Sequence, residues 1–284
     1  MTLLDGKQTA KTLNTALKLK ITEDTKYLRA PHLAIILVGN HPASLSYIKG
    51  KLKAAESVGI KATLHHLEEH VTTDIVYELI QTLNKDSDVD GMILQLPLPK
   101  HLDEAYLTSA IDVNKDADGF HVLNQGLLYQ GKESIKPATP YGMTLLLQAY
   151  NIDVLGKHAV IIGRSNIVGF PIARLLMDLG ATITICHSKT KDLAYHTTQA
   201  DILVVSVGKP HLINKNHIKK DVVILDVGIN KVGDKLVGDV NFDDVYDLTS
   251  AITPVPGGVG PMTIHALLLN TYHLYEKHVK MKSK

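Results

Sequence analysis

The sequence has a single cysteine, almost no net charge and no long apolar run. The one cysteine among 284 residues, Cys186, excludes a disulfide within the chain and favours a reducing compartment. A formal charge of +1 gives no reason to expect a nucleic acid or a membrane as partner. No apolar run approaches about 18 residues, so we expect no membrane-spanning helix. The first residues lack the charged-then-apolar order of a signal peptide, which leads us to expect a cytoplasmic protein.

Short apolar runs alternate with amphipathic segments, which is typical of an α/β protein. Hydrophobic residues at 45% and charged residues at 21% are ordinary for a globular chain. The spacing predicts helices and strands in turn: a helix over 8–20, a strand over 33–39, a helix over 43–58, a strand over 60–67, a helix over 73–83 that Thr73 caps, a strand over 92–96, helices over 103–109 and 141–150, strands near 158–163, 181–187, 202–207 and 222–228, and a last helix over 262–284.

We therefore expect two α/β domains, each with a mostly parallel sheet flanked by helices and with a cleft between the domains. Residues 137–140, a Pro-Ala-Thr-Pro connector, place the boundary. The expected domains are 1–138 plus 263–284, and 139–262, the second of them Rossmann-like.

A strand, a tight turn and a helix follow one another over 157–180. The strand ends in Gly163, the turn is bounded by Gly163 and Gly169, Pro171 opens the helix, and Gly180 closes it. Free N–H groups at such a helix start can bind a phosphate. The turn is not G-x-G-x-x-G, because Ser165 stands at the middle glycine, and an ordinary crossover that binds nothing is the alternative.

No carboxylate follows the next strand, where a dinucleotide fold normally places one on the ribose hydroxyls. Residues 187–190 read His-Ser-Lys-Thr there, and Arg164 lies in the preceding turn. Both features suit a 2′-phosphate, which predicts NADP rather than NAD. The loops 228–230 and 254–261 also follow strand ends, at the edge where open α/β sheets bind ligands.

In the first half, Tyr47 and Lys51 are four residues apart on a predicted helix and therefore share a face. A lysine near an aromatic ring in a cleft can bind an anion or act as a base. The alternative is that Lys49, Lys51 and Lys53 form a solvated face. Gln95 ends a strand between apolar residues, either as a buried hydrogen-bonded spacer or as a residue of the cleft.

Two patterns in the first half resemble metal sites but do not fit them. Asp116 and Asp118 lie on a polar loop, yet counting from Asn114 places Gln125 where a calcium loop needs a bidentate glutamate. Residues 66–70 match H-x-x-E-H, a zinc motif that requires a helix, whereas the predicted strand ends there. We predict no metal site.

Several long strings in the sequence are shared with one known family. They are Leu4–Lys7, Pro42–Ser44 leading to Tyr47 and Lys51, Gln95–Pro99, Lys115–His121, Gly163–Ser165, Val168–Pro171, Cys186–Thr190, Val237–Val240 and Thr253–Thr263. Through these strings the chain resembles, almost end to end, the bifunctional methylenetetrahydrofolate dehydrogenase–methenyltetrahydrofolate cyclohydrolases. The resemblance implies oxidation of 5,10-methylenetetrahydrofolate with NADP, followed by hydrolysis of the product to 10-formyltetrahydrofolate.

The resemblance also implies roles for individual residues. Lys51 would carry the cyclohydrolase chemistry, Tyr47 would pack against the folate, Gln95 would tune the lysine, and Asp118 would hold the donors of the folate ring. The implied substrate-binding set further includes Leu96, Pro256 and Gly257. The implied NADP-binding set is Thr139, Gly163, Arg164, Ser165, Ser188, Val207, Gly208, Gly228, Ile229, Gly260 and Thr263.

The family implies a homodimer and tetrahydrofolate derivatives as substrates, with or without a polyglutamate tail. Three positions depart from its common pattern: Ala138 replaces a cysteine, and Val113 and Val122 stand where proline is frequent. None of the three belongs to the implied catalytic set. Two alternatives are another NADP-dependent two-domain dehydrogenase and a dinucleotide-binding protein without activity. The set Tyr47, Lys51, Gln95 and Asp118 argues against the first of these.

Overall fold

A computed structural model describes residues 1–282 of the chain, and residues 42, 43 and 280–282 by their backbone only. The chain forms two compact units. We call Thr12–Ala138 with Ile264–Lys284 the three-stranded unit, and Met1–Lys11 with Thr139–Thr263 the six-stranded unit. Each is an α/β unit built on a parallel sheet, as the alternation of apolar and amphipathic segments predicts.

The six-stranded unit is organised by a parallel sheet in the order β1-β11-β8-β7-β5-β6. Its strands are β1 (Thr2–Leu3), β5 (His158–Ile162), β6 (Thr182–Cys186), β7 (Ile202–Val205), β8 (Val222–Asp226) and β11 (Thr249–Ile252). From β5 the chain runs to β6 on one side and then to β7 on the other. This reversal beside β5 is the switch point at which such sheets bind ligands, at the carboxyl ends of the strands.

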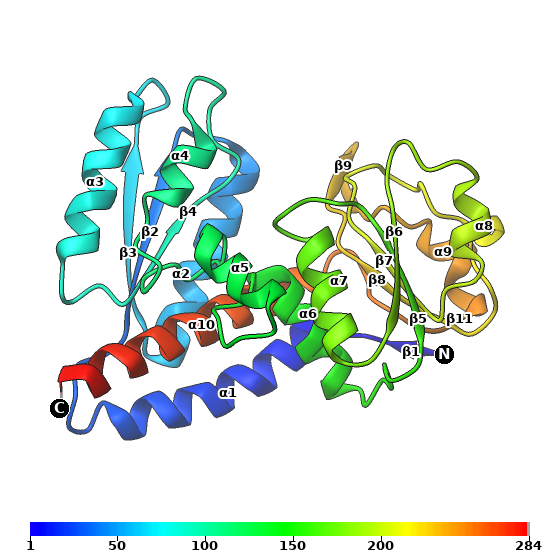
Figure 1. Cartoon of the computed structure of the whole chain (residues 1–284), viewed down its shortest axis with the longest axis horizontal. Helices are drawn as coiled ribbons and strands as arrows, with labels where there is room; N and C mark the ends of the chain where they lie inside the picture. Colours follow the sequence, from blue (N-terminus) through cyan, green and yellow to red (C-terminus); the bar gives the residue numbers. More distant parts are fainter. Residues whose placement is uncertain (283–284) are drawn as a thin grey trace. The chain divides into compact units, whose positions relative to one another are not determined.

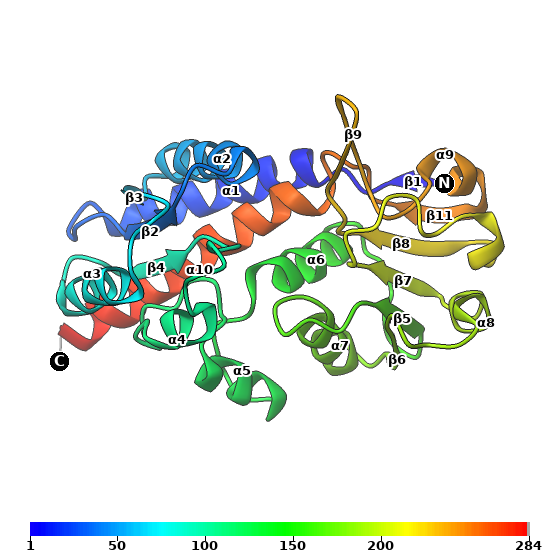
Figure 2. The ribbon, with the colours of Figure 1, turned by 90° about the horizontal axis from the view of Figure 1, so that it is seen from above.

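Helices cover both faces of this sheet (Figure 2). They are α6 (Ala138–Ala149), α7 (Gly169–Asp178), α8 (Leu193–Thr197) and α9 (Phe242–Val245), with 3₁₀ turns at Lys215–His217 and Tyr246–Leu248. One buried cluster joins Val160, Leu203 and Ile224 to the α8–α9 side. A hairpin of β9 (Asn230–Val232) and β10 (Lys235–Val237) extends from the end of β8.

The three-stranded unit has the parallel order β3-β2-β4. Its elements are β2 (His32–Val38), α2 (Pro42–Val58), β3 (Lys61–Leu67), α3 (Thr73–Lys85), β4 (Gly91–Leu94), α4 (Glu104–Ser109) and α5 (Val122–Tyr129). All seven residues of β2 are buried, as expected of a central parallel strand. Ala34, Ile36 and Met92 pack against Val76 and Ile80 of α3, whereas α2 lies across the opposite face (Figure 2).

Two long helices, α1 (Gly6–Asp24) and α10 (Val259–Lys282), contain residues of both units (Figure 1). Residues 1–11 do not lie where the sequence prediction placed them. β1 pairs in parallel with β11, and the amide of Leu4 donates to the carbonyl of Ile252 at 2.8 Å. These bonds join the first residues to a sheet that forms some 250 residues later, a pairing that no local pattern announces.

Local details differ in three more places. The cap of α3 is Thr72, whose hydroxyl accepts from the amide of Ile75, and not Thr73. The connector 137–140 is partly helical, because α6 already begins at Ala138. The sequence prediction contains no element for helix α5, for α8, for β11 or for the β9–β10 hairpin. Each of these elements is eight residues or shorter, too short for a clear apolar period.

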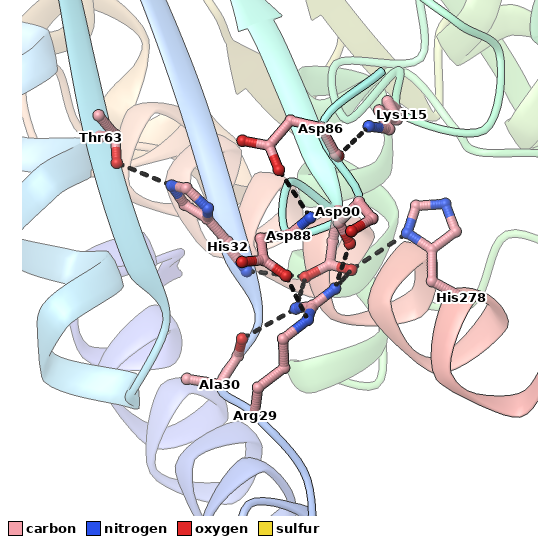
Figure 3. A network of polar contacts seen from close by, with 10 residues as sticks. Arg29, Ala30, His32, Thr63, Asp86, Asp88, Asp90, Lys115 and His278 are labelled. Carbon is pink, nitrogen blue, oxygen red and sulfur yellow. Dashed lines mark hydrogen bonds and ion pairs between the residues drawn. The ribbon is translucent and has the colours of Figure 1, made fainter. Parts of the chain in front are cut away.

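A buried carboxylate fastens α10 to the three-stranded sheet (Figure 3). The side chain of Asp90 is fully buried and accepts two bonds from the guanidinium of Arg29, at 2.6 and 2.7 Å. It also accepts from the amide of His32 at 2.9 Å and contacts His278 Nδ1 of α10 at 3.1 Å. The Arg29 guanidinium lies 5.6 Å from the ring centre of Tyr275, also on α10.

Candidate active site

Lys51 is a buried amine of the three-stranded unit. It lies on α2 one turn after Tyr47, and its Nζ is 5.2 Å from the centre of the Tyr47 ring. The residue is 4% exposed, whereas Lys49 and Lys53 on the same helix are exposed. The alternative of a solvated lysine face is therefore wrong for Lys51, although it holds for its two neighbours.

Gln95 holds the lysine by its side-chain amide. Its backbone N–H donates to the carbonyl of Ile36 at 2.8 Å, which extends the β2–β4 ladder by one residue. The Nε2 donates to the carbonyl of Leu96 at 2.7 Å, and Oε1 accepts from Lys51 Nζ at 3.0 Å. Of the two possibilities left open by the sequence, Gln95 is hydrogen-bonded, and its partner is the candidate catalytic lysine.

The loop that carries Asp118 is fixed beside β4. Met92 exchanges backbone bonds with it, donating to the carbonyl of Lys115 at 2.6 Å and accepting from Ala117 at 3.2 Å. Asn270 of α10 donates to the carbonyl of Ala117 at 2.9 Å. Gly119 has φ +73°, and a Cβ there would lie 2.6 Å from the carbonyl carbon of Lys136, so the turn requires glycine.

The two carboxylates of this loop have separate roles. Asp116 is buried and accepts from the amides of Gly119, Phe120 and His121 and from Asn124 Nδ2, at 2.8 to 3.1 Å. Asp116 therefore holds the loop together. The Asp118 carboxylate, which is partly exposed, accepts no hydrogen bond from the described residues, 1–282, and is left for a ligand.

Burial shifts both ionisable groups of this site toward their neutral forms. It lowers the pKa of Lys51, and the charge of Asp118 opposes that shift only in part. Burial likewise raises the pKa of Asp118 to about 6, with Lys51 acting against the rise. An amine whose pKa is lowered by burial, and which is hydrogen-bonded to a side-chain amide, is suited to proton transfer.

The predicted phosphate turn follows β5 at the switch point of the other sheet. Gly163 has φ +122°, and a Cβ there would lie 2.6 Å from the carbonyl oxygen of Ser206, so glycine is required. Ser165 Oγ accepts from the amides of Val168 and Gly169 at 3.2 and 3.4 Å, which ties the turn to the start of α7. Within residues 1–282, the amides of residues 164–167 donate to no protein acceptor in a hydrogen bond, which leaves an anion site open.

The other residues implied for the cofactor lie in the same unit. Ser188 is exposed after β6, Val207 and Gly208 follow β7, and Gly228 and Ile229 follow β8. Thr263 Oγ1 donates to Thr139 Oγ1 at 3.1 Å, joining the start of α10 to α6, and Gly260 lies in the first turn of α10. Pro256 and Gly257, implied for the substrate, precede α10 in this unit, whereas Leu96 lies in the three-stranded unit.

Sequence reasoning missed two buried carboxylates in this unit, Asp226 and Asp239. Asp239 accepts from the amides of Val207, Gly208 and Lys209, so these amides are not available to a cofactor phosphate. A signal existed: each carboxylate lies next to or near a glycine, Gly238 before Asp239 and Gly228 after Asp226.

The H-x-x-E-H segment is a strand end followed by a loop. His66 lies in β3, and its Nε2 contacts the carbonyl oxygen of Gly39 at 2.9 Å. Across the part of the chain that the structure describes, no three His, Cys, Asp or Glu side chains are grouped to hold a metal ion. Over the same residues, no helix combines the length and apolarity that crossing a membrane requires.

One unit has a parallel sheet with a phosphate-type turn at its switch point, and the other holds a buried lysine. Together they define a two-domain α/β enzyme that uses a nucleotide cofactor. Residues 4–118 match the catalytic domain of the tetrahydrofolate dehydrogenase/cyclohydrolase family, and residues 137–279 match its NAD(P)-binding domain. The chain therefore belongs to the tetrahydrofolate dehydrogenase/cyclohydrolase family.

Relatives of similar length support this membership. The bifunctional protein FolD of Acholeplasma laidlawii is 54% identical over 278 residues, covering 98% of this chain and 99% of the relative. The bifunctional enzyme FolD of Campylobacter jejuni has the same fold, with a TM-score of 0.96, 47% identity and coverage of 98% and 99%. The Trypanosoma brucei enzyme, solved with NADP and an inhibitor, has a TM-score of 0.94, 34% identity and 98% coverage of both chains.

Proposed function

We propose that this chain oxidises 5,10-methylenetetrahydrofolate to 5,10-methenyltetrahydrofolate with NADP and then hydrolyses the product to 10-formyltetrahydrofolate. The observation that carries this proposal is the buried Lys51, bonded to Gln95 and opposed by Asp118, in a chain that matches both domains of the family. In this proposal the three-stranded unit binds the folate, and the six-stranded unit binds NADP.

The residues of the six-stranded unit fit NADP. The open amides of the Gly163–Gly169 turn suit the diphosphate. Arg164 and Ser188 are exposed, and residues 187–190 after β6 contain no carboxylate of the kind that binds ribose hydroxyls. The cofactor, when bound, supplies the acceptor of a hydride. This step moves an electron pair with its hydrogen and no separate proton, so the chain contributes alignment rather than an acid or base.

Ring opening needs proton transfer, and Lys51 is the group placed to perform it. Water adds to a cationic amidinium carbon, loses a proton, and one carbon–nitrogen bond then breaks with protonation of the nitrogen. Burial lowers the pKa of Lys51, and a cationic substrate would lower it further, so both favour the neutral amine that a base or proton relay needs. Tyr47 would pack on the folate ring, and Asp118 would accept from its N–H donors.

A spectrophotometric assay tests both steps. We expect NADP-dependent conversion of methylenetetrahydrofolate, faster than with NAD at equal concentration, and hydrolysis of added methenyltetrahydrofolate without any cofactor. Faster reaction with NAD would overturn the choice of NADP. Turnover of a simple hydroxy acid without turnover of the folate would overturn the proposed function itself.

We also propose that the protein is a cytoplasmic homodimer that accepts substrates with or without a polyglutamate tail. Twofold homodimers are the commonest oligomers among soluble proteins, and the family resemblance points the same way. Light scattering after gel filtration should give twice the mass of 31.1 kDa. A monomer at micromolar concentration would contradict the dimer and leave the catalytic proposal standing.

A further inference from the structure

Asp239 is a buried carboxylate inside a ring of backbone amides. It is 0% exposed and lies two residues after β10. Its Oδ2 accepts from the amides of Val207 and Gly208 at 2.7 and 2.9 Å, and its Oδ1 accepts from Lys209 at 2.7 Å. Three successive N–H groups around one anion form a nest of the kind that elsewhere binds phosphate. Here the protein itself supplies the anion.

Asp226 in turn holds Asp239. It ends β8 and is 4% exposed, and its Oδ1 accepts from the amides of Gly228 and Asp239, both at 3.0 Å. Its Oδ2 accepts from the amide of Val240 at 2.9 Å. The two carboxylates thus form a chain that fixes the loop after β7 and the loop after β8 to each other.

Close packing around the two carboxylates leaves no room for side chains. A Cβ on Gly228 would overlap the carboxylate of Asp239, and a Cβ on Gly238 would overlap that of Asp226. Asn230 Nδ2 adds a fourth bond to Asp239, at 2.9 Å from Oδ1. Seven hydrogen bonds to the two carboxylates and the two close glycine contacts together hold the loops in this arrangement.

This arrangement decides what the two loops can present to a ligand. Their strands, β7 and β8, are neighbours in the sheet, and both loops leave at the carboxyl edge where dinucleotides bind. The amides of residues 207–209 are directed to Asp239, whereas the side chains of Val207 and Ile229 are 40% and 58% exposed. An apolar surface with its amides turned away suits the face of a flat ring and does not suit a phosphate.

We propose that Asp239 and Asp226 are positioning residues for the dinucleotide, which set the loops after β7 and β8 for its rings while the Gly163–Gly169 turn takes its phosphates. This inference rests on the proposed use of NADP. Burial and the nearby charge of Asp239 raise the pKa of Asp226 to about 6, and the amide donors around its carboxylate oppose that rise.

The test is Asp239→Asn in the full-length protein. An asparagine turns an NH₂ group toward amide donors that need an acceptor, so the 207–209 loop must move. We expect KM and Kd for NADP to rise about 10- to 100-fold, the effect of displacing a positioned group by about 1 Å. Hydrolysis of methenyltetrahydrofolate, assayed without NADP, should stay within about twofold of wild type, because Lys51, Gln95 and Asp118 lie in the other unit.

Asp234→Asn is the matched control. Asp234 lies in the turn of the same hairpin and is exposed, so the variant removes the same charge without touching the nest. It should leave both activities unchanged. Should Asp239→Asn not fold, Asp226→Asn is the second variant: its carbonyl still accepts from Gly228 and Asp239 and only the bond from Val240 is lost, so a smaller rise in KM for NADP is expected.

Three results overturn the positioning role. These are KM and Kd for NADP within twofold of wild type, a loss of both activities together with a lower melting temperature, and an equal effect of Asp234→Asn. Failure of this inference is distinct from failure of the proposed function. If wild type oxidises methylenetetrahydrofolate with NADP and Asp239→Asn does so equally well, only the positioning role is lost.

Discussion

At the scale of single residues, Lys51 is distinguished from its neighbours by burial alone. Lys49, Lys51 and Lys53 have the same chemistry, and only Lys51 is taken out of water and bonded to a side-chain amide. Loss of hydration disfavours the charged form of its amine and so lowers its pKa.

Lys51→Met should therefore separate the two activities. Methionine fills a similar volume without an amine, so ring opening should fall by about 10² to 10⁴, the usual contribution of a general base. Hydride transfer needs no proton and should survive in part. Both rates are measured on the purified variant, with Lys49→Met as a control that should change neither. Equal losses in both steps would overturn the assignment of Lys51.

Gln95→Glu should move the pH dependence of ring opening. A carboxylate 3.0 Å from Lys51 Nζ favours the ammonium form and raises the pKa of the lysine, typically by one unit or more. The acidic limb of the kcat profile should then shift to higher pH. Asp118→Asn should shift it the other way, since the Asp118 charge now raises that pKa. A limb that stays in place in both variants would show that it does not report Lys51.

At the scale of elements, prediction from the sequence is limited by range. The strands of both sheets other than β1 and β11 are predicted, and the clearest of them is β2, because a strand buried on both faces is a continuous apolar run. β1 is missed because two residues carry no period, and only β11 gives them a partner. The same holds for the site: Tyr47 and Lys51 share a helix and can be paired from spacing, whereas the amides around Asp239 come from a loop thirty residues earlier.

The contact between α6 and the start of α10 allows no side chain at Gly142. A Cβ there would lie 2.6 Å from the carbonyl oxygen of Met262, closer than any real contact. Gly142→Ala must push the two helices apart, and we expect a loss of about 1–3 kcal/mol in the free energy of unfolding.

Gly126→Ala is its counterpart in α5, where a new Cβ meets nothing within 4 Å. Removing a glycine from a helix interior should stabilise the protein by about 0.5–1 kcal/mol. Urea unfolding of both variants tests the pair. A Gly142→Ala protein as stable as wild type would show that the helices do not pack as closely as described.

At the scale of the whole molecule, two buried groups make contributions to the free energy of unfolding that change in opposite directions with pH. His265 on α10 is 3% exposed, with Nδ1 2.7 Å from Asn14 Oδ1, and burial lowers its pKa to about 4. Its contribution to stability is complete above pH 6.5 and is lost as the pH falls toward 4. Asp226 has the opposite sense: with a pKa raised to about 6, it costs nothing below pH 3.8 and destabilises the fold increasingly as the pH rises to 6.

Each of these shifts corresponds to about 3 kcal/mol at its limit, so between pH 4 and 6 the two largely cancel. The variants should uncover them one at a time. Relative to wild type, His265→Gln should become more stable as the pH falls from 6.5 to 4, and Asp226→Asn should become more stable as the pH rises from 4 to 6. Unfolding free energies measured across this range decide the matter, because a profile for His265→Gln parallel to that of wild type would mean that burial does not lower the pKa of His265.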